Sequence, residues 1–368
     1  MRPNSPFRRS LPREWRPRRL LILKACCIGD AVMTTPALTA LRAKYPFARI
    51  DVAVGRWTRV VYDHYPLIDR VLDIGEMIGG RRPPIMHFLG LARRIADQRY
   101  DGVIVMERSF WFALLAVLGN IPIRIGFESG GRGFTHTIPV DVKGVRHEIE
   151  RYSDLAVAAG ARKPDQQMTF DAKTSARATA LQIIEANGLT DRPFALVHPG
   201  GGSNPGMQLL SKRWPIDRFV GIVGRLIETN VRPIAVWGPG EEILGRSLQG
   251  AGAVPVGDVS LPVLSALAAR ASVFVGNDTG PSHIAAASGA RTVVIFGPTD
   301  ERRYGPFGTR ADGSPVGEAV SEPVLTGNSV SDRWLDRSID GVSTEKVWDA
   351  ISRALTHSAH DASTHLRS

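Results

Sequence analysis

The sequence predicts an α/β fold made of two doubly wound domains, each built on a parallel sheet with helices on both faces. Short apolar runs rich in Val, Ile and Leu alternate with longer segments of helical period along the chain. Continuous apolar strands between helices are typical of parallel sheets that are covered on both sides. This alternation occurs twice, and 368 residues are enough for two domains with separate cores. We therefore expect two such domains facing a central cleft.

The apolar runs and the helical segments set the expected order of elements in the first half. Strands are predicted at Leu20–Lys24, Ile50–Val54, Val71–Ile74, Gly102–Met106 and Arg124–Phe127. Helices are predicted at Ala31–Lys44, Pro84–Gln98, Phe110–Leu118 and Lys143–Ala159.

The second half repeats the pattern. Strands are predicted at Phe194–His198, Pro233–Trp237, Val254–Val256, Val273–Val275 and Thr292–Phe296. Helices are predicted at Ile216–Glu228, Glu241–Leu248, Pro262–Ala269 and Ser282–Ala287. Ligands of doubly wound sheets bind at the carboxyl ends of the strands, so functional residues are sought there.

A polar segment at Gly160–Asp171 interrupts this rhythm and separates the halves. We expect an N-terminal domain over 19–165 and a C-terminal domain over 166–342. A helix over 343–357, with Ser343 as its N-cap, is expected to pack back on the N-terminal domain. Residues 358–368 are polar and are expected to form a disordered tail.

The net charge of +10 is concentrated at the N-terminus, where seven arginines and one acid give residues 1–19 a charge of +6. We expect residues 1–18 to be a flexible basic tail, suited either to an anionic surface such as the inner face of the cytoplasmic membrane or to free solvation. A nucleic-acid-binding protein would spread its basic residues along one face among aromatic side chains. We therefore expect no nucleic-acid partner.

The cysteine pair and the apolar runs indicate a cytoplasmic protein. Adjacent Cys26 and Cys27 cannot make a disulfide framework, which fits a reducing compartment. Lys24 interrupts the first apolar run, so a signal peptide is not expected. The longest apolar stretch, Phe110–Ile123, is broken by Gly119 and is too short to cross a bilayer.

The first candidate segment follows the first strand, where Gly29 permits a tight turn and Asp30 stands at the start of a helix. Asp30 has two interpretations. It is either the N-cap of that helix or a general base on a strand-to-helix loop. The roles are partly exclusive, because a carboxylate that accepts two backbone N–H bonds is a poor base.

The second segment runs from a glycine-rich loop containing Gly201 and Gly202 to Ser211, Lys212 and Arg213. Glycines after a strand let backbone N–H groups approach an anion, and the basic residues add positive charge. The alternative is a surface loop with ordinary basic residues. The loop has no Walker spacing, and no Gly-x-Gly-x-x-Gly opens the first helix, which weakens a nicotinamide-cofactor interpretation.

The third segment, Val275–Ala287, places an acid, a hydroxyl, a glycine and a histidine at a strand-to-helix turn. Unpaired N–H groups at such a helix start attract a diphosphate. The turn comprises Asp278, Thr279, Gly280, Ser282 and His283. We expect Asp278 to bond sugar hydroxyls or backbone amides. His283 either donates to the phosphate or sugar, or packs within the turn.

A fourth strand-end loop, after the strand at Pro233–Trp237, carries Glu241. Its carboxylate either binds ribose or sugar hydroxyls, or favours the N-terminus of its own helix.

Taken in order, these segments resemble glycosyltransferase family 9, the ADP-heptose:lipopolysaccharide heptosyltransferases. The resemblance runs from about Leu20 to Leu355. Its anchors are Ile28–Asp30 with Thr35–Leu38, Lys212–Pro215, Gly276–His283, Phe296–Asp300 and Arg303–Pro306. The resemblance implies a GT-B fold, an acceptor-side first domain, a donor-side second domain, no metal requirement and inversion at the anomeric carbon.

The resemblance also implies roles for individual residues. Asp30 resembles the family's catalytic base, and Lys212 resembles the lysine that contacts the donor diphosphate and assists catalysis. Glu241 resembles the acid that holds the ribose. The remaining expected donor contacts are Gly29, Gly201, Gly202, Ser211, Asp278, Thr279, Gly280, Ser282 and His283. We expect no cofactor beyond a nucleotide-sugar co-substrate, which the resemblance implies to be ADP-linked.

The function that follows is transfer of a sugar, heptose by the resemblance, to a hydroxyl of a lipopolysaccharide-core or related glycan acceptor. The sequence departs from the family pattern where Pro205–Leu210 lengthens the glycine-rich loop, and this leaves the sugar open. The alternatives are a transferase of the same fold with another nucleotide-sugar donor, and a non-catalytic nucleotide-sugar-binding protein. Asp30 disfavours the second.

Overall fold

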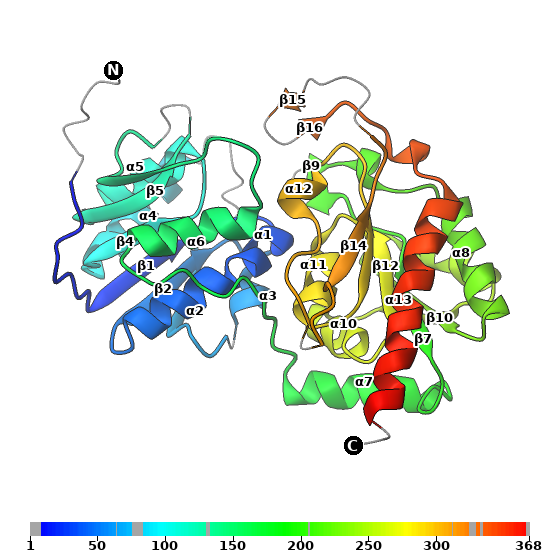
Figure 1. The fold of residues 1–368 in the computed structure, drawn as a ribbon. Coiled ribbons are helices and arrows are strands. Elements are labelled where there is room, and N and C mark those ends of the chain that lie inside the picture. The colour runs from blue at the N-terminus through cyan, green and yellow to red at the C-terminus, as the bar shows by residue number, and fades with distance from the viewer. Residues whose placement is uncertain are drawn as a thin grey trace. The chain divides into compact units, whose positions relative to one another are not determined.

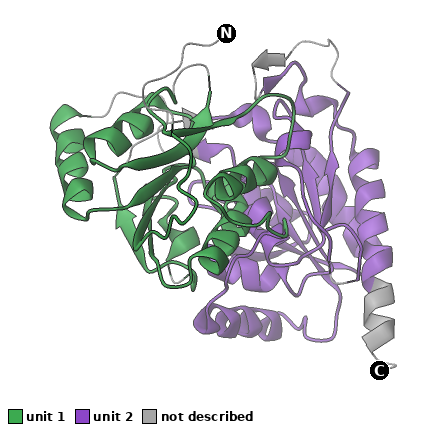
Figure 2. Cartoon of the chain, turned by 60° about the vertical axis from the view of Figure 1, so that its left-hand side comes forward, with its two compact units in different colours: residues 1–166 green, residues 167–368 purple. Residues whose placement is uncertain are grey.

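The computed structural model divides the chain into two compact units, residues 1–166 (unit 1) and 167–368 (unit 2) (Figures 1 and 2). It describes residues 9–63, 65–75, 84–129, 133–204, 207–310, 312–323, 329–331 and 334–365. Within these ranges no helix combines the length and apolar character that a membrane span requires.

Unit 1 contains a six-stranded sheet in the order β3-β2-β1-β4-β5-β6, and every neighbouring pair is parallel. The strands are β1 (Arg19–Leu23), β2 (Arg49–Val54), β3 (Arg70–Asp73), β4 (Gly102–Val105), β5 (Ile123–Glu128) and β6 (Ile138–Asp141). The helices are α1 (Ile28–Met33), α2 (Thr35–Lys44), α3 (Arg59–Tyr62), α4 (Ile85–Asp97), α5 (Phe110–Leu118) and α6 (Glu148–Ala158).

The alternation of side chains along β1 explains how this sheet is covered on both faces. Leu21 and Leu23 join a buried cluster that includes Phe88 of α4 and Phe112 of α5. Helices α2 and α6 contact each other, and α6 also contacts β5 and β6. Strand β1 is therefore buried on both sides, which is why it reads as a continuous apolar run.

Unit 2 repeats the architecture, with strand order β11-β10-β7-β12-β13-β14 and parallel pairing throughout this sheet. Its strands are β7 (Phe194–His198), β10 (Arg232–Trp237), β11 (Val254–Asp258), β12 (Val273–Asn277), β13 (Thr292–Ile295) and β14 (Gly317–Val320). Its helices are α7 (Thr174–Ala186), α8 (Ile216–Glu228), α9 (Glu242–Gly250), α10 (Leu261–Ala268), α11 (Gly280–Ala287), α12 (Glu301–Tyr304) and α13 (Thr344–His365), with 3-10 turns η1 (Leu210–Lys212) and η2 (Ile339–Gly341). Two short antiparallel pairs, β8 (Ser203–Asn204) with β9 (Met207–Gln208) and β15 (Ser329–Ser331) with β16 (Trp334–Leu335), lie outside the sheet.

Several elements differ from the sequence prediction. The expected helix over 31–44 is two helices, α1 and α2, which meet at Thr34. Helix α7 and the edge strands β6 and β14 were not predicted, because their apolar patterns are weak or short. The glycine-rich loop before Ser211 contains the hairpin of β8 and β9, and only β9 falls within the expected insertion over 205–210. Residues 205–206, which link the two strands, lie outside the described part of the chain.

The two terminal segments also differ from the prediction. Helix α13 continues to His365, and it packs against α8 and strands β12 to β14 of unit 2, whereas the sequence predicts packing on the N-terminal domain. Its buried face, including Val347 and Ile351, completes the second core. The last residues, 366–368, are not described.

Residues 9–18 are packed against unit 1 rather than forming a flexible tail. The main-chain N–H of Arg9 donates to Thr137 O at 2.8 Å, and that of Arg18 donates to an Asp101 carboxylate oxygen at 2.6 Å. The Trp15 ring meets Tyr45 edge-on at 5.5 Å between centroids. The other part of the predicted tail, residues 1–8, is outside the described residues.

Candidate functional site

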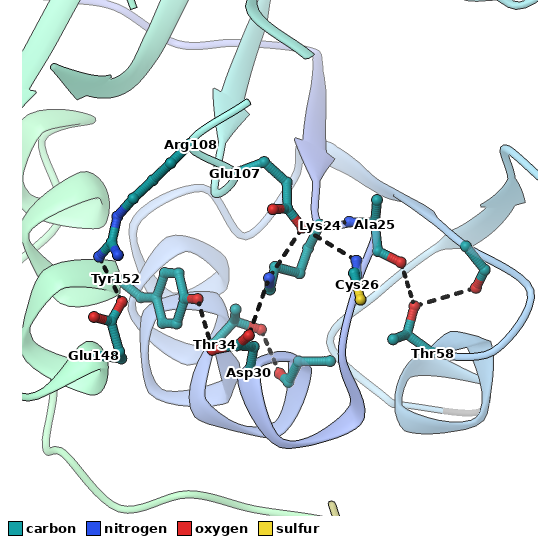
Figure 3. A network of polar contacts seen from close by, with 12 residues as sticks. Lys24, Ala25, Cys26, Asp30, Thr34, Thr58, Glu107, Arg108, Glu148 and Tyr152 are labelled. Carbon is teal, nitrogen blue, oxygen red and sulfur yellow. Dashed lines mark hydrogen bonds and ion pairs between the residues drawn. The ribbon is translucent and has the colours of Figure 1, made fainter. Parts of the chain in front are cut away.

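The turn between β1 and α1 has an unusual backbone at Cys27, where φ is 98° and ψ is 146°. Non-glycine residues rarely adopt such a conformation, and it persists only where the surroundings fix it. Here Glu107 does so from the end of β4. Its Oε1 accepts the main-chain N–H groups of Ala25 at 2.9 Å and Cys26 at 3.1 Å (Figure 3). The turn is thus held in a strained shape next to Asp30.

Asp30 lies in the first turn of α1, and its carboxylate makes side-chain contacts only weakly. Tyr152 Oη donates to Asp30 Oδ1 at 3.4 Å, and Lys24 Nζ lies 3.9 Å from Oδ2 (Figure 3). The N-cap position belongs to Cys27, and no side chain caps this helix. The N-cap interpretation of Asp30 is therefore wrong. With 20% of its side chain exposed, the carboxylate remains accessible to a hydroxyl.

Lys24 and Tyr152, the two side chains next to the Asp30 carboxylate, each remain in one protonation state. Burial alone lowers the pKa of Lys24, but the carboxylates of Glu107, at 3.0 Å, and Asp30 raise it well above the usual value. Burial and the charge of Asp30 raise the pKa of Tyr152. Lys24 therefore stays cationic and Tyr152 stays a hydrogen-bond donor. Sequence reasoning missed both roles, although a lysine that ends an apolar strand was a visible signal.

The loop after β7 requires glycine at two positions, because other side chains occupy the space that a Cβ would fill. A Cβ on Gly200 would lie 1.9 Å from Glu241 Oε2. One on Gly201, where φ is +102°, would lie 1.9 Å from Thr279 Cγ2. The loop after β7 is therefore pressed against residues that follow β10 and β12.

Glu241 braces this loop with both carboxylate oxygens. Oε1 accepts the N–H of Gly201 at 2.5 Å and an Arg213 N–H at 3.1 Å, while Oε2 accepts the N–H of Gly238 at 2.9 Å. Glu241 is also the N-cap residue of α9, although its side chain makes no capping hydrogen bond there, so its charge can still favour the start of its own helix. A bond to ribose would have to share these oxygens.

Asp278 is buried and makes contacts that the sequence did not predict. Lys212 Nζ lies 2.6 Å from its Oδ2, the Thr299 hydroxyl donates to the same oxygen at 2.7 Å, and His283 Nε2 lies 3.4 Å from Oδ1. Burial alone raises the pKa of this carboxyl, but Lys212 and His283 hold it well below its usual range. The sequence predicts bonds to sugar hydroxyls or to backbone amides, whereas the hydrogen bonds that the Asp278 carboxylate accepts within the described residues come from side chains. Lys212 and His283 thus meet at one carboxylate.

The hydroxyl groups of Ser282 and Thr279, in the same turn as Asp278, differ in their hydrogen bonding. Ser282 donates to Asn277 O at 2.6 Å and is buried, so its hydroxyl is used inside the turn. Thr279 Oγ1 is buried and has no hydrogen-bond partner among the residues that the structure describes. A buried polar atom without a partner is uncommon, so this hydroxyl is available to a ligand or to a water molecule.

The remaining predicted donor contacts of unit 2 lie in the segments that follow β7 and β12. Asn277 joins the segments, since its Nδ2 donates to Pro199 O and Gly200 O and its Oδ1 accepts the Trp214 N–H. Gly280 begins α11, Ser211 is exposed in η1, and Gly202 is buried in the loop. Gly29 lies buried in α1 of unit 1. No group of three or more metal-ligating side chains occurs in the described ranges.

A comparison with protein-family models identifies the family of this chain. The model of glycosyltransferase family 9 (heptosyltransferase) matches residues 88–324. Lipopolysaccharide heptosyltransferase 2 of Salmonella typhimurium is 28% identical over 304 residues, covering 76% of this chain and 83% of the relative. The family model covers most of the chain, including the segments from Gly201 to His283 that carry the predicted donor contacts of unit 2.

Two solved structures show the same fold. A glycosyltransferase family 9 structure from Veillonella parvula has a TM-score of 0.74 at 20% identity, covering 92% of this chain and 97% of that one. The E. coli heptosyltransferase WaaC with ADP-2-deoxy-2-fluoro heptose has a TM-score of 0.67 at 21% identity, covering 91% and 99%. The predicted α/β fold with two doubly wound sheets, the GT-B fold, is confirmed.

Proposed function

We propose a reaction for this chain from one premise: the chain belongs to glycosyltransferase family 9, whose model spans residues 88–324. It is a glycosyltransferase. We propose that it moves a heptosyl group from ADP-heptose to a hydroxyl of a lipopolysaccharide-core or related glycan acceptor. The family match carries this proposal, and the E. coli relative bound to an ADP-heptose analogue supports the choice of donor.

Asp30 is the base of the proposed reaction. Its carboxylate takes the proton of the acceptor hydroxyl, whose oxygen then attacks the anomeric carbon on the face opposite the diphosphate. The bond from that carbon to the diphosphate breaks as the new glycosidic bond forms, which inverts the anomeric centre. Tyr152 and Lys24 keep the carboxylate oriented through the contacts at 3.4 Å and 3.9 Å.

Lys212 stabilises the leaving diphosphate, on which negative charge accumulates as the bond breaks. The Lys212 ammonium lies 2.6 Å from Asp278 Oδ2, and the lysine side chain is 16% exposed. The hydroxyl of Thr279, the residue after Asp278, is the second donor that we propose; it has no hydrogen-bond partner among the described residues. Preorganised donors of this kind typically contribute about 100- to 1000-fold to the rate.

Glu241 and Gly201 form the nucleoside side of the proposed donor site. Glu241 Oε1 binds the Gly201 N–H at 2.5 Å, which fixes the loop against the acid. A ribose hydroxyl can donate to the same carboxylate, because a carboxylate has about four lone-pair sites. The loop and the acid then define one wall of the pocket.

A donor titration tests the proposed function. The full chain is titrated calorimetrically with ADP-heptose and with UDP-, GDP- and dTDP-sugars, and transfer to lipopolysaccharide-core acceptors is then followed by mass spectrometry. Binding and transfer with ADP-heptose alone is the expected result. Transfer from another nucleotide sugar would show that ADP-heptose is not the donor. Binding without any transfer would indicate a non-catalytic protein.

The cytoplasmic side of the membrane is the proposed place of action. Arg13, Arg16 and Arg18 are exposed on the packed N-terminal segment and can contact anionic lipid. Cosedimentation with vesicles of anionic and of neutral lipids tests this contact. Replacement of the three arginines by glutamine should abolish binding to the anionic vesicles, and unchanged binding would show that the segment is only solvated.

A further inference from the structure

One carboxylate oxygen of Asp278 accepts from two side chains at once. Lys212 Nζ lies 2.6 Å from Asp278 Oδ2, and the Thr299 hydroxyl donates to that oxygen at 2.7 Å. Lys212 comes from η1, whereas Thr299 follows β13. The two donors therefore share the negative charge of a group that is only 4% exposed.

Hydrogen bonds from Leu335 and Arg337 hold the main chain of Thr299 and of the two residues before it. Arg337 Nη2 donates to Thr299 O at 2.6 Å, and Arg337 Nε donates to Gly297 O at 2.5 Å. The Leu335 N–H donates to Pro298 O at 2.6 Å. Thr299 and Arg337 are both buried, so the hydroxyl is fixed toward Asp278.

The loop that carries Thr299 is also packed against the segment that carries Lys212. A Cβ on Gly297 would lie 2.9 Å from the main-chain oxygen of Ser211, the residue before Lys212. The main chain beside Lys212 and the main chain that leads to Thr299 are therefore in close contact.

We propose that Thr299 is a positioning residue of the donor site, which acts on Lys212 through Asp278. The role rests on the proposed function of Lys212 at the diphosphate. When Lys212 turns toward the diphosphate, the Thr299 hydroxyl keeps Asp278 Oδ2 hydrogen-bonded. Without that hydroxyl, the turn of Lys212 would leave a buried carboxylate oxygen unpartnered, which is costly.

Substitution of Thr299 separates this role from packing. Thr299→Val removes the hydroxyl at nearly constant volume and should raise the donor KM about tenfold, the loss typical of one hydrogen bond to a charged group. The kcat should fall as well, because Lys212 also stabilises the charge that develops on the leaving diphosphate. Thr299→Ser keeps a hydroxyl and should restore the donor KM to within about twofold of the wild type.

Thr292→Val is the matched control. Thr292 is buried at the start of β13, and its hydroxyl meets the main-chain oxygen of Val316 at 3.5 Å, a weak contact. The control should leave KM and kcat unchanged. Melting temperatures of both Val variants show whether the change in KM has a folding origin.

A double-mutant cycle with Lys212→Ala identifies the partner. In that background Thr299→Val should change the donor KM by less than about twofold, since the side chain on which Thr299 acts is absent. The donor KM of the Lys212→Ala variants is measured from their residual turnover at a saturating concentration of acceptor.

The outcomes separate the two proposals. A wild-type protein that neither binds nor transfers from any nucleotide sugar refutes the proposed function, and the role of Thr299 with it. With an active wild type, the positioning role is overturned by an unchanged KM in Thr299→Val or by a Thr299→Ser variant as poor as Thr299→Val. A full tenfold effect in the Lys212→Ala background overturns it equally.

Discussion

The pair of Lys212 and Asp278 makes a prediction about stability that is independent of any substrate. Replacing Lys212 by methionine keeps most of the side-chain volume but leaves the Asp278 carboxylate, 4% exposed, without its cationic partner at 2.6 Å. Breaking a buried ion pair by removing one partner typically costs about 3–5 kcal/mol. Thr299 and His283 remain as donors, and the lysine itself is 16% exposed, so the lower end applies.

The expected loss is therefore about 3 kcal/mol of unfolding free energy. Unit 2 spans 167–368, and for a domain of that size each kcal/mol lowers the melting temperature by roughly 2–4 °C. We expect Lys212→Met to lower the melting temperature of the unit 2 transition by about 6–12 °C. Differential scanning calorimetry of the full chain measures it.

Lys346→Met is the matched control for that substitution. Lys346 Nζ lies 2.6 Å from Glu322 Oε1, the same separation, but its side chain is 49% exposed. Exposed ion pairs contribute about 0–1 kcal/mol, so this variant should melt within about 4 °C of the wild type.

A compensating variant decides whether the buried charge is the cause. Lys212→Met combined with Asp278→Asn removes the charge and keeps an acceptor for Thr299, so it should recover most of the lost stability without recovering activity. If Lys212→Met melts like the wild type, or if the double variant is no more stable than the single one, the electrostatic reasoning fails.

Two further predictions concern the proposed chemistry and the loop. Asp30→Asn should lower kcat by about 100-fold or more and leave donor affinity within twofold, because a general base acts on the acceptor proton; near-normal turnover would remove Asp30 from the mechanism. Gly201→Ala should abolish measurable donor binding, since the new Cβ would lie 1.9 Å from Thr279 Cγ2 at a φ of +102°. Gly224→Ala in α8 has open space around its Cβ and should bind donor normally; equal behaviour of the two alanine variants would show that the loop tolerates the side chain.

The sequence by itself determined the architecture and placed the candidate site residues at strand ends. Apolar runs such as Leu20–Lys24 mark buried strands because a strand covered on both faces has no polar side. The glycines, acids and basic residues that follow those strands marked the strand ends. These signals are local, since each depends on a few consecutive residues. Weak local signals were missed, as at α7 and at the packed segment 9–18.

Only the tertiary structure decided which of these residues meet. Lys212 and Asp278 are 66 positions apart, and Thr299 lies 21 positions beyond Asp278. They converge because β7, β12 and β13 are neighbours in a parallel sheet and therefore end at the same edge. The surroundings of Asp30 converge in the same way, since Glu107, which pairs with Lys24 beside Asp30, follows β4, the neighbour of β1. Strand order decides which hydrogen-bond donors lie next to each carboxylate. It is a property of the assembled sheet, so no short stretch of sequence contains it.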